Sequence, residues 1–232
     1  MSAIENIECT VIGAGAVGLA VARALALQGR EVIILESASS IGTETSSRNS
    51  EIIHAGIYYE PGSLKAELCV RGKLALYDYC KSRGIPFKRC GKMIVATNKN
   101  QIENLKALQK KAVANGVTDL IWQDKKATLE MEPALNAMAS LLSPSTGIID
   151  SHALMLSYQG EAEANGAVIA FNTPVLSGEA IESAILLHVG GETPMTVKSK
   201  FVFNCGGLNA QKIAASLIGF PDEYVPETHY AK

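Results

Sequence analysis

A glycine-rich turn between an apolar run and an alanine-rich segment is the feature that most constrains how this chain can fold. Residues 7–12 form an apolar, β-branched run typical of a buried parallel strand. The glycines of a G-x-G-x-x-G pattern follow at Gly13, Gly15 and Gly18. Gly13 allows a tight turn, Gly15 lets the backbone approach a pyrophosphate, and Gly18 lets the next helix pack closely on the sheet. The pattern therefore predicts a strand–turn–helix unit that binds phosphate.

The residues after the glycines complete a dinucleotide-binding βαβ unit. Residues 16–28 are rich in Ala and Leu and contain no Pro, so they predict a helix with Ala16 and Val17 in its positively polarised first turn. Residues 31–35 predict a second strand that leads into Glu36, at about the distance where an acid accepts hydrogen bonds from ribose hydroxyls. A plain strand-to-helix connection is the alternative, but the flanking elements favour a dinucleotide. The unit does not separate NAD from FAD.

The composition is that of an ordinary globular protein. The 232 residues are 47% hydrophobic, and 21 basic against 23 acidic side chains leave a net charge of −2. No charge run and no apolar stretch of membrane-spanning length is present, so neither nucleic acid nor a membrane span is expected. The five cysteines are scattered without a C-x-x-C pair, which favours free thiols over disulfides or a metal site. With no targeting segment before the first strand, we expect a cytoplasmic protein and leave peripheral membrane contact open.

The rest of the chain continues the alternation of helices and strands. An α/β fold with a Rossmann-like domain and a second, interleaved α+β subdomain is therefore expected. Helices are predicted at 61–82, where Pro61 opens the helix, at 100–115, at 151–165 and after Gly207 through Leu217. Strands are predicted at 91–97, 120–123, 167–171 and 201–204, with a β-meander interrupted by Gly178 at 173–189.

Residues 46–59 are the chemically densest part of the chain. They follow a Ser- and Thr-rich segment from Ser37 to Asn49 that predicts an irregular loop over a ligand, and they combine hydroxyls, a guanidinium and the imidazole of His54. Gly206 and Gly207 follow a predicted strand, where a backbone can approach a ligand closely. An ordinary strand-to-helix turn is the alternative for this glycine pair.

Residues 46–59, continued by 58–70 and 90–96, resemble the FAD-dependent oxidoreductases of the D-amino acid oxidase and glycine oxidase type, most of all the group that oxidises L-2-hydroxyglutarate. Weaker similarity covers essentially the whole chain. The resemblance implies an FAD-binding domain formed by residues 1–84 and 145–220, and a substrate domain formed in part by residues 85–144 and 221–232. Because family members are longer, the fold is expected to be incomplete at its C-terminal end.

The resemblance also implies which residues contact FAD. The motif glycines and Glu36 hold the ADP half, the loop before Ser50 follows the pyrophosphate and ribityl chain, and Arg48 compensates phosphate charge rather than binding substrate. The backbone of Val175 meets adenine. The predicted set is Gly13, Gly15, Ala16, Val17, Gly18, Glu36, Ser37, Ser46, Ser47, Arg48, Asn49, Val175, Cys205, Gly206 and Gly207.

His54 is the predicted catalytic residue, because the resemblance places it beside the isoalloxazine ring. A neutral imidazole there accepts the hydroxyl proton of a 2-hydroxy acid as hydride leaves C2. The alternative for His54 is a hydrogen-bonded structural role. Tyr58 and Tyr59 either donate hydrogen bonds to a carboxylate or pack in the core. Glu51 stands where close relatives carry glycine, and its charge would repel an anionic substrate unless it is paired or turned away.

The expected function is FAD-dependent oxidation of a 2-hydroxy acid similar to L-2-hydroxyglutarate, giving the 2-oxo acid. Quinone or O₂ is expected as the electron acceptor, without a metal ion. An FAD-dependent amino-acid or glycine-type oxidase is one alternative. A truncated FAD-binding module without turnover is another, and the 232-residue chain alone is expected to be inactive or nearly so.

Overall fold

The computed structural model describes residues 4–225, which form two compact units. Unit 1 consists of the residues up to Asn49 and from Ser151 onward, and unit 2 consists of Ser50–Asp150. A seven-stranded sheet with helices on its faces forms unit 1, whereas two three-stranded sheets and three helices form the described part of unit 2. The α/β class predicted from the sequence is confirmed.

Unit 1 is built on a mixed sheet of strand order β13-β10-β11-β12-β1-β2-β9. Strands β12, β1, β2 and β9 run parallel, and β10 to β12 form an antiparallel meander. The strands are β1 (Ile4–Ile12), β2 (Val32–Leu35), β9 (Val168–Ala170), β10 (Val175–Ile181), β11 (Ala184–Val189), β12 (Met195–Asn204) and β13 (Leu217–Ile218); the helices are α1 (Ala16–Ala26), α5 (Ser151–Ala164) and α6 (Ala210–Ala215). The carboxyl end of β1 therefore lies between those of β2 and β12.

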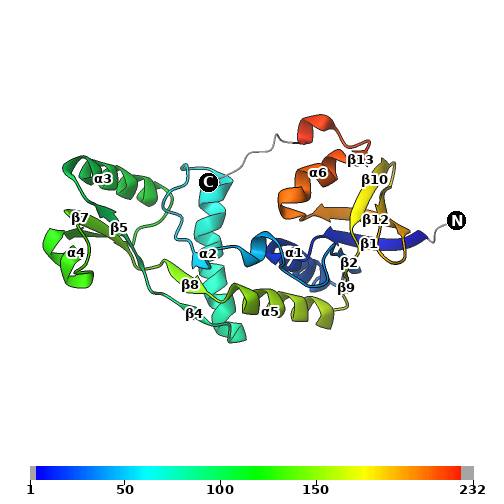
Figure 1. Cartoon of the computed structure of the whole chain (residues 1–232), viewed down its shortest axis with the longest axis horizontal. Helices are drawn as coiled ribbons and strands as arrows, with labels where there is room; N and C mark the ends of the chain where they lie inside the picture. Colours follow the sequence, from blue (N-terminus) through cyan, green and yellow to red (C-terminus); the bar gives the residue numbers. More distant parts are fainter. Residues whose placement is uncertain (1–3, 226–232) are drawn as a thin grey trace. The chain divides into compact units, whose positions relative to one another are not determined.

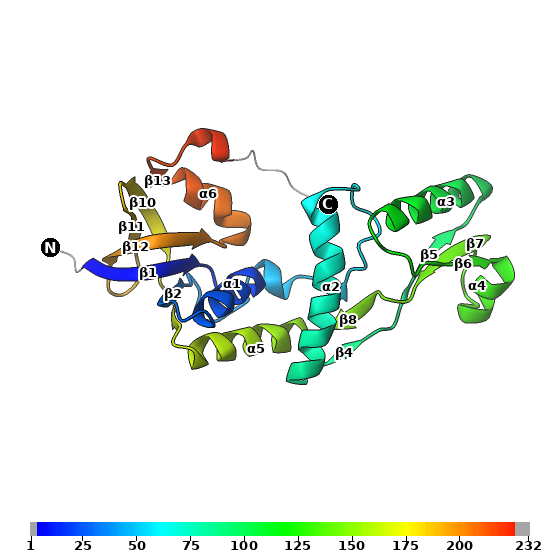
Figure 2. The same cartoon turned by 180° about the vertical axis from the view of Figure 1, so that it is seen from behind.

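Alternating side chains of the central strand β1 supply a core on each face of this sheet. Val11 is buried together with Leu19 of α1 and Met155 of α5. Ile12 points to the opposite face and belongs to the cluster against which Ile213 of α6 packs. Figures 1 and 2 show α1 and α5 on one face of the sheet and α6 on the other. Burial on both faces explains why every residue of the carboxyl half of the strand, Cys9–Ile12, is buried, instead of every second one.

Unit 2 combines a long helix with sheets of order β5-β7-β6 and β3-β8-β4. Its strands are β3 (Ile52–Ile53), β4 (Phe87–Lys88), β5 (Lys92–Ala96), β6 (Ile121–Asp124), β7 (Ala139–Ser143) and β8 (Gly147–Ile149); its helices are α2 (Leu64–Arg83), α3 (Lys99–Ala114) and α4 (Lys125–Met131). Leu105 of α3 packs with Leu141 on one face of the β5-β7-β6 sheet. Helix α4 lies on the other face (Figure 1). Its Thr128 hydroxyl lies 2.9 Å from that of Ser140.

The start of α2 and the role of Gly178 differ from the predictions made from the sequence. Helix α2 begins after Ser63 and not at Pro61, because the Ser63 hydroxyl caps the helix by accepting a hydrogen bond from Ala66 N at 3.2 Å. Gly178 lies inside β10 and does not interrupt the meander. A Cβ at Gly178 would lie 2.5 Å from the carbonyl oxygen of Leu186, so the glycine permits close approach of β11.

The boundaries of the compact units differ from those of the predicted domains. Residues 50–84 belong to unit 2, because β3 pairs with β8 and because Tyr77 of α2 donates a hydrogen bond to the carbonyl oxygen of Ser145 at 3.0 Å. The assignment of one domain to FAD and the other to substrate stays a prediction. Residues 226–232 of the predicted substrate domain lie outside the described residues.

Glu51 adopts a backbone conformation that favours glycine. Its φ is 54°, in the left-handed region, and its carbonyl oxygen accepts a hydrogen bond from Ile149 N at 3.0 Å. A side chain in this region costs about 1–2 kcal/mol, which a glycine avoids. Glu51 therefore replaces the glycine of the family pattern at a position where the backbone conformation is strained for any other residue.

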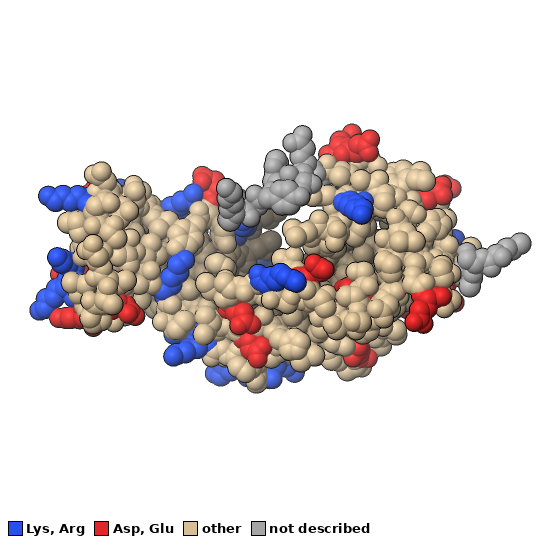
Figure 3. All heavy atoms as spheres, in the orientation of Figure 1, with Lys and Arg blue, Asp and Glu red and all other residues tan. Residues whose placement is uncertain are grey.

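Charged side chains of both signs are distributed over the face drawn in Figure 3. In the part of the chain that the structure describes, no helix has both the length and the apolar character needed to cross a bilayer.

We expect Gly18→Ala to destabilise unit 1. A Cβ at Gly18 would lie 1.9 Å from the carbonyl oxygen of Gly13, so α1 would have to move away from the turn. Overpacking of this kind costs about 1–3 kcal/mol or more in free energy of unfolding, measured by urea denaturation. Gly160→Ala in α5 is the matched control, since nothing lies within 4 Å of its added Cβ, and it should be neutral or stabilising by about 0.5–1 kcal/mol. Equal stability of the two variants would contradict the packing argument.

Candidate functional site

The turn after β1, at Gly13, packs against the turn after β12, at Cys205. Gly13 has φ 98°, and its amide donates a hydrogen bond to the carbonyl oxygen of Leu35 at 2.8 Å. A Cβ at Gly13 would lie 2.7 Å from the carbonyl oxygen of Cys205, and Cys205 N donates to the carbonyl oxygen of Ile12 at 2.9 Å. The turn after β1 is thus held between the ends of β2 and β12, with no room for a side chain.

Helix α1 presents its first amides at this edge of the sheet. Gly15 is the N-cap, and Ala16 N donates a hydrogen bond to the Ser46 hydroxyl at 3.0 Å. A Cβ at Gly15 would lie 2.9 Å from that hydroxyl oxygen. The amides of Val17 and Gly18 have no acceptor within an α-helix, and such amides bind phosphate oxygens. The arrangement is a helix start whose free amides are suited to an anion, closed on one side by the Ser46 loop.

Glu36 is buried at the end of β2, with 8% of its surface exposed. Its Oε2 accepts a hydrogen bond from Ala14 N at 2.7 Å, and its Oε1 accepts from Ala38 N at 2.8 Å and from the Ser37 hydroxyl at 3.2 Å. A carboxylate offers about four lone-pair sites, so acceptor capacity remains for a ribose hydroxyl. Glu36 therefore holds the glycine turn in place as well as supplying the acid of the motif.

The hydroxyl-rich loop folds back on itself. The Ser47 hydroxyl and the Arg48 guanidinium both donate hydrogen bonds to the carbonyl oxygen of Thr43, at 3.1 and 2.7 Å. Asn49 Nδ2 donates to the carbonyl oxygen of Ser46 at 2.6 Å. These bonds stabilise the loop next to the start of α1. Contacts of Ser47, Arg48 and Asn49 with a cofactor stay predictions.

The glycine pair after β12 lies against the same loop. Gly207 has φ 54°, and a Cβ there would lie 3.8 Å from the Thr45 hydroxyl oxygen. Gly206 is confined by Ile213 of α6, whose Cδ1 would lie 2.5 Å from an added Cβ. Burial raises the pKa of the Cys205 thiol, which makes this cysteine a neutral packing group. Gly206 therefore meets a spatial requirement of the fold, and Gly207 a conformational one.

Val175 opens β10 close to the end of β2, because Thr173 N donates a hydrogen bond to the carbonyl oxygen of Glu36 at 2.8 Å. The predicted cofactor residues thus belong to segments that meet at one edge of the unit 1 sheet. A dinucleotide fits this edge, because the first amides of α1 lack helical acceptors and a carboxylate stands at the end of β2, as in dinucleotide-binding βαβ units. That each of these residues contacts the cofactor stays a prediction.

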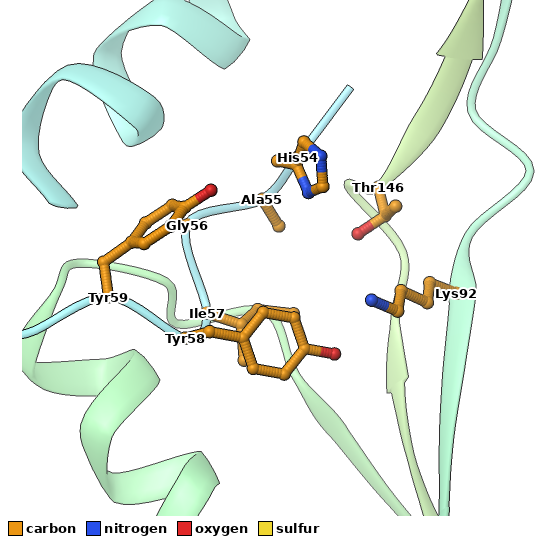
Figure 4. A pocket seen from close by; sticks show the side chains of 8 residues that line it. All are labelled: His54, Ala55, Gly56, Ile57, Tyr58, Tyr59, Lys92 and Thr146. Atoms are coloured by element: carbon orange, nitrogen blue, oxygen red, sulfur yellow. The ribbon is translucent and has the colours of Figure 1, made fainter. Parts of the chain in front are cut away.

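Unit 2 contains the pocket to which His54 belongs (Figure 4). Gly56 has φ 99°, and a Cβ there would lie 2.7 Å from Val70 Cγ2, so this segment passes close to α2. Asn115 Nδ2 donates hydrogen bonds to the carbonyl oxygens of Gly56 and Tyr59, at 3.1 and 2.9 Å, which fixes the segment. The lining residues are His54, Ala55, Gly56, Ile57, Tyr58, Tyr59, Lys92 and Thr146. Glu51, whose charge was expected to repel an anionic substrate, is not one of them.

Partial burial and two ammonium groups lower the pKa of His54. Burial has the largest effect, followed by the charges of Lys92 and Lys65. Lys92 Nζ lies 4.6 Å from the ring centroid of Tyr58, and Lys65 Nζ lies 4.9 Å from that of Tyr59. A pKa below the usual value of about 6.5 keeps the imidazole neutral at pH 7, and only the neutral form accepts a proton.

A hydrogen-bonded chain connects α2 to the backbone of His54. The Cys69 thiol donates to the carbonyl oxygen of His54 at a sulfur–oxygen distance of 3.5 Å, and the Tyr59 hydroxyl is hydrogen-bonded to Cys69. Burial raises the pKa of both Cys69 and Tyr59, so both groups are neutral at pH 7. The chain holds the main chain at His54 and leaves its imidazole free to face the pocket. It also accounts for Tyr59, which therefore has a structural contact in addition to its place in the lining.

Lys92 and Thr146 are pocket residues that the sequence did not identify. Lys92 lies at the start of β5 and Thr146 follows β7, so strand pairing and not spacing along the chain brings them to His54. The one sequence indication was for Lys92, which falls in the run 90–96 that resembles the family. His54 and the predicted cofactor residues belong to different units, and its role beside a flavin stays a prediction. Among the described residues no group of three or more His, Cys, Asp or Glu side chains is placed to hold a metal ion.

Comparison with known proteins identifies a family. The family described as FAD dependent oxidoreductase matches residues 8–231. The mitochondrial L-2-hydroxyglutarate dehydrogenase of Arabidopsis thaliana is 43% identical over 98% of this chain and 53% of its own length. The human protein of that name is 33% identical over 90% of this chain and 48% of its own length. The chain thus spans about half the length of the curated relatives it matches.

Solved structures agree with this family. The FAD-bound L-alpha-glycerophosphate oxidase of Mycoplasma pneumoniae matches with a TM-score of 0.87 and 27% identity, over 92% of this chain and 57% of that one. Glycine oxidase from Geobacillus kaustophilus matches with a TM-score of 0.81 at 21% identity, over 91% of this chain and 58% of that one, which supports the fold alone. The predicted resemblance and the choice of FAD over NAD are confirmed at the level of the family.

The predicted cytoplasmic location is contradicted by these relatives. The L-2-hydroxyglutarate dehydrogenases of Arabidopsis thaliana, Nematostella vectensis and Homo sapiens are all named as mitochondrial. The prediction rested on free cysteines and on the absence of a targeting segment. Free cysteines are equally compatible with any reducing compartment, and a segment absent from one sequence carries no information about location.

We expect Glu36→Ala to weaken FAD binding by about 1.5–3 kcal/mol, because charged acceptors of hydrogen bonds contribute about this much. The free energy of unfolding of the apoprotein should also fall, by about 1–3 kcal/mol, since Ala14 N loses its acceptor in a buried position. Fluorescence titration of the apoprotein with FAD measures the first effect and urea denaturation the second. Glu5→Ala, an exposed carboxylate on β1, is the control. Unchanged FAD affinity in Glu36→Ala would show that the acid serves the turn alone.

We expect the pKa of His54 to lie below about 6.5 and to rise in Lys92→Met, because removing a nearby positive charge favours the protonated imidazole. The neutral imidazole would then be lost at a higher pH, so any rate that depends on it should begin to fall at a higher pH as the solution is acidified. NMR titration of the His54 ring measures the pKa. Lys88→Met, an exposed lysine on β4 of the same unit, should leave it unchanged. An equal His54 pKa in Lys92→Met and in wild type would show that the charge of Lys92 does not lower it.

Proposed function

This chain belongs to the family of FAD-dependent oxidoreductases, and we propose that it oxidises a 2-hydroxy acid, L-2-hydroxyglutarate or a close analogue, to the 2-oxo acid. The similarity to L-2-hydroxyglutarate dehydrogenases over nearly the whole chain supports this substrate class. The reduced cofactor is reoxidised by a quinone or by O₂.

In this proposal, unit 1 binds the cofactor. The amides of Val17 and Gly18 bind the pyrophosphate, and Glu36 accepts a hydrogen bond from the ribose. Ser46 keeps the start of α1 closed by accepting a hydrogen bond from Ala16 N. FAD, when bound, supplies the two-electron acceptor that amino-acid side chains lack.

The charge around His54 is the observation that carries the choice of a hydroxy acid. Lys92 and Lys65 keep the imidazole neutral, so it accepts the proton of a C2 hydroxyl as the C2–H bond breaks. The same two ammonium groups attract a carboxylate and repel the ammonium form of an amino acid. The pocket therefore favours oxidation at a CH–OH carbon over oxidation at a CH–NH₂ carbon.

We expect L-2-hydroxyglutarate to reduce the bound flavin when the protein is extended to the length of its relatives. His54→Asn should lower the rate of flavin reduction by about 10²–10⁴-fold, the usual contribution of a general base, with little loss of bound FAD. Stopped-flow absorbance of the flavin measures the rate. His152→Asn is the matched control, since His152 is an exposed residue of α5 outside the pocket.

Three outcomes would contradict the proposal. A near-wild-type rate in His54→Asn would exclude the base role. Ammonia release from amino acids, without reduction by 2-hydroxy acids, would assign the protein to amine donors. Release of NAD instead of FAD on denaturation would exclude the cofactor.

A further inference from the structure

We propose that Lys92 and Thr146 bind the carboxylate adjacent to the hydroxyl-bearing carbon of the substrate and thereby place its C2 hydroxyl at His54. The inference rests on the proposed function and deepens it, because it names the residues that recognise a 2-hydroxy acid by its C1 carboxylate. Figure 4 shows the Lys92 ammonium and the Thr146 hydroxyl on one side of the pocket, with the rings of His54 and Tyr58 on its other sides.

Lys92 is a cation at the pocket wall without a carboxylate partner. Its side chain is half-buried and held over the ring of Tyr58. Among the residues that the structure describes, no Asp or Glu forms an ion pair with Lys92 or with Lys65. Both ammonium groups act on the same imidazole, and no acidic residue lines the pocket. A bound anion would offset this excess of positive charge.

Thr146 provides a hydrogen-bond donor beside this charge. The residue is buried, with 4% of its surface exposed, and its hydroxyl oxygen lies 2.8 Å from that of Ser143. When Ser143 donates this hydrogen bond, the Thr146 proton is available to a carboxylate oxygen. The carbonyl oxygen of Thr146 accepts a hydrogen bond from Gly91 N at 2.9 Å, which ties Thr146 to the residue before Lys92. Thr146 and Lys92 thus line the same side of the pocket (Figure 4).

The turn that carries Thr146 is held from α2. Lys73 is buried, and its Nζ donates a hydrogen bond to the Ser145 hydroxyl at 2.9 Å. The Tyr77 hydroxyl donates to the carbonyl oxygen of Ser145 at 3.0 Å. Recognition of a small ligand requires donors whose positions are set before binding, and these contacts set the position of Thr146. A carboxylate and the neighbouring hydroxyl match three of the polar groups that line the pocket: the Lys92 ammonium, the Thr146 hydroxyl and the neutral imidazole of His54.

The test is binding of 2-oxoglutarate to the FAD-loaded 232-residue chain, which separates recognition from turnover. The His54 ring resonances report binding, because a carboxylate beside the imidazole changes its surroundings. Lys92→Met should weaken binding by about 10- to 100-fold, the loss expected for one charge-assisted hydrogen bond. Lys92→Arg should retain most of the affinity, and Lys88→Met should retain all of it. Pyruvate, which has only the C1 carboxylate, should lose the same factor in Lys92→Met.

Equal affinity of wild type and Lys92→Met for 2-oxoglutarate would overturn the inference, as would the absence of any ligand-dependent change at His54 in the wild type. An amide spectrum of Lys92→Met that matches wild type outside the pocket establishes that this variant is folded. If Lys92→Met is not folded, Lys92→Arg still tests the inference, because it should retain most of the affinity. A failure of the proposed function has a different outcome, in which carboxylate binding depends on Lys92 but L-2-hydroxyglutarate does not reduce the flavin of the extended protein.

Discussion

The contact between the first turn of α1 and the turn after β1 is the constraint on which the rest of unit 1 depends. Gly18 faces the carbonyl oxygen of Gly13 at a separation that no side chain tolerates. This approach sets the start of α1 over the carboxyl end of β1, where β2 and β12 also end. Helix amides, the buried carboxylate of Glu36 and the turn at Cys205 therefore converge at this edge of the sheet.

The two units present positive charge by different physical means. Unit 1 uses backbone amides at a helix start, which carry partial charges and need no ionised side chain. Its buried carboxylate is tolerated because Ala14 N, Ala38 N and the Ser37 hydroxyl all donate to it. Unit 2 instead places full charges, Lys92 and Lys65, next to an imidazole and steadies each by a tyrosine ring. A diffuse diphosphate suits the first arrangement, and a compact carboxylate suits the second.

The segment between Glu51 and Tyr59 shows how a backbone is held in costly conformations near a pocket. Glu51 and Gly56 both have positive φ. This conformation is costly for Glu51, because it has a Cβ and glycine does not. Hydrogen bonds from Ile149 N and from Asn115 Nδ2 fix the two ends of the segment, and the Cys69 thiol binds its middle. The result is a main chain with little freedom on either side of His54.

The sequence by itself determined the βαβ unit and the FAD family, because those conclusions depend on residue types at short, fixed spacings. Glycine spacing, apolar periodicity and the acid at Glu36 are local properties that survive without knowledge of the fold. Only the tertiary structure decided that residues 50–84 belong to unit 2, that Glu36 also ties down the glycine turn, and that Lys92 and Thr146 share a pocket with His54. Those relations arise from strand pairing and helix packing between segments far apart in the chain, and no local pattern encodes which distant residues will meet.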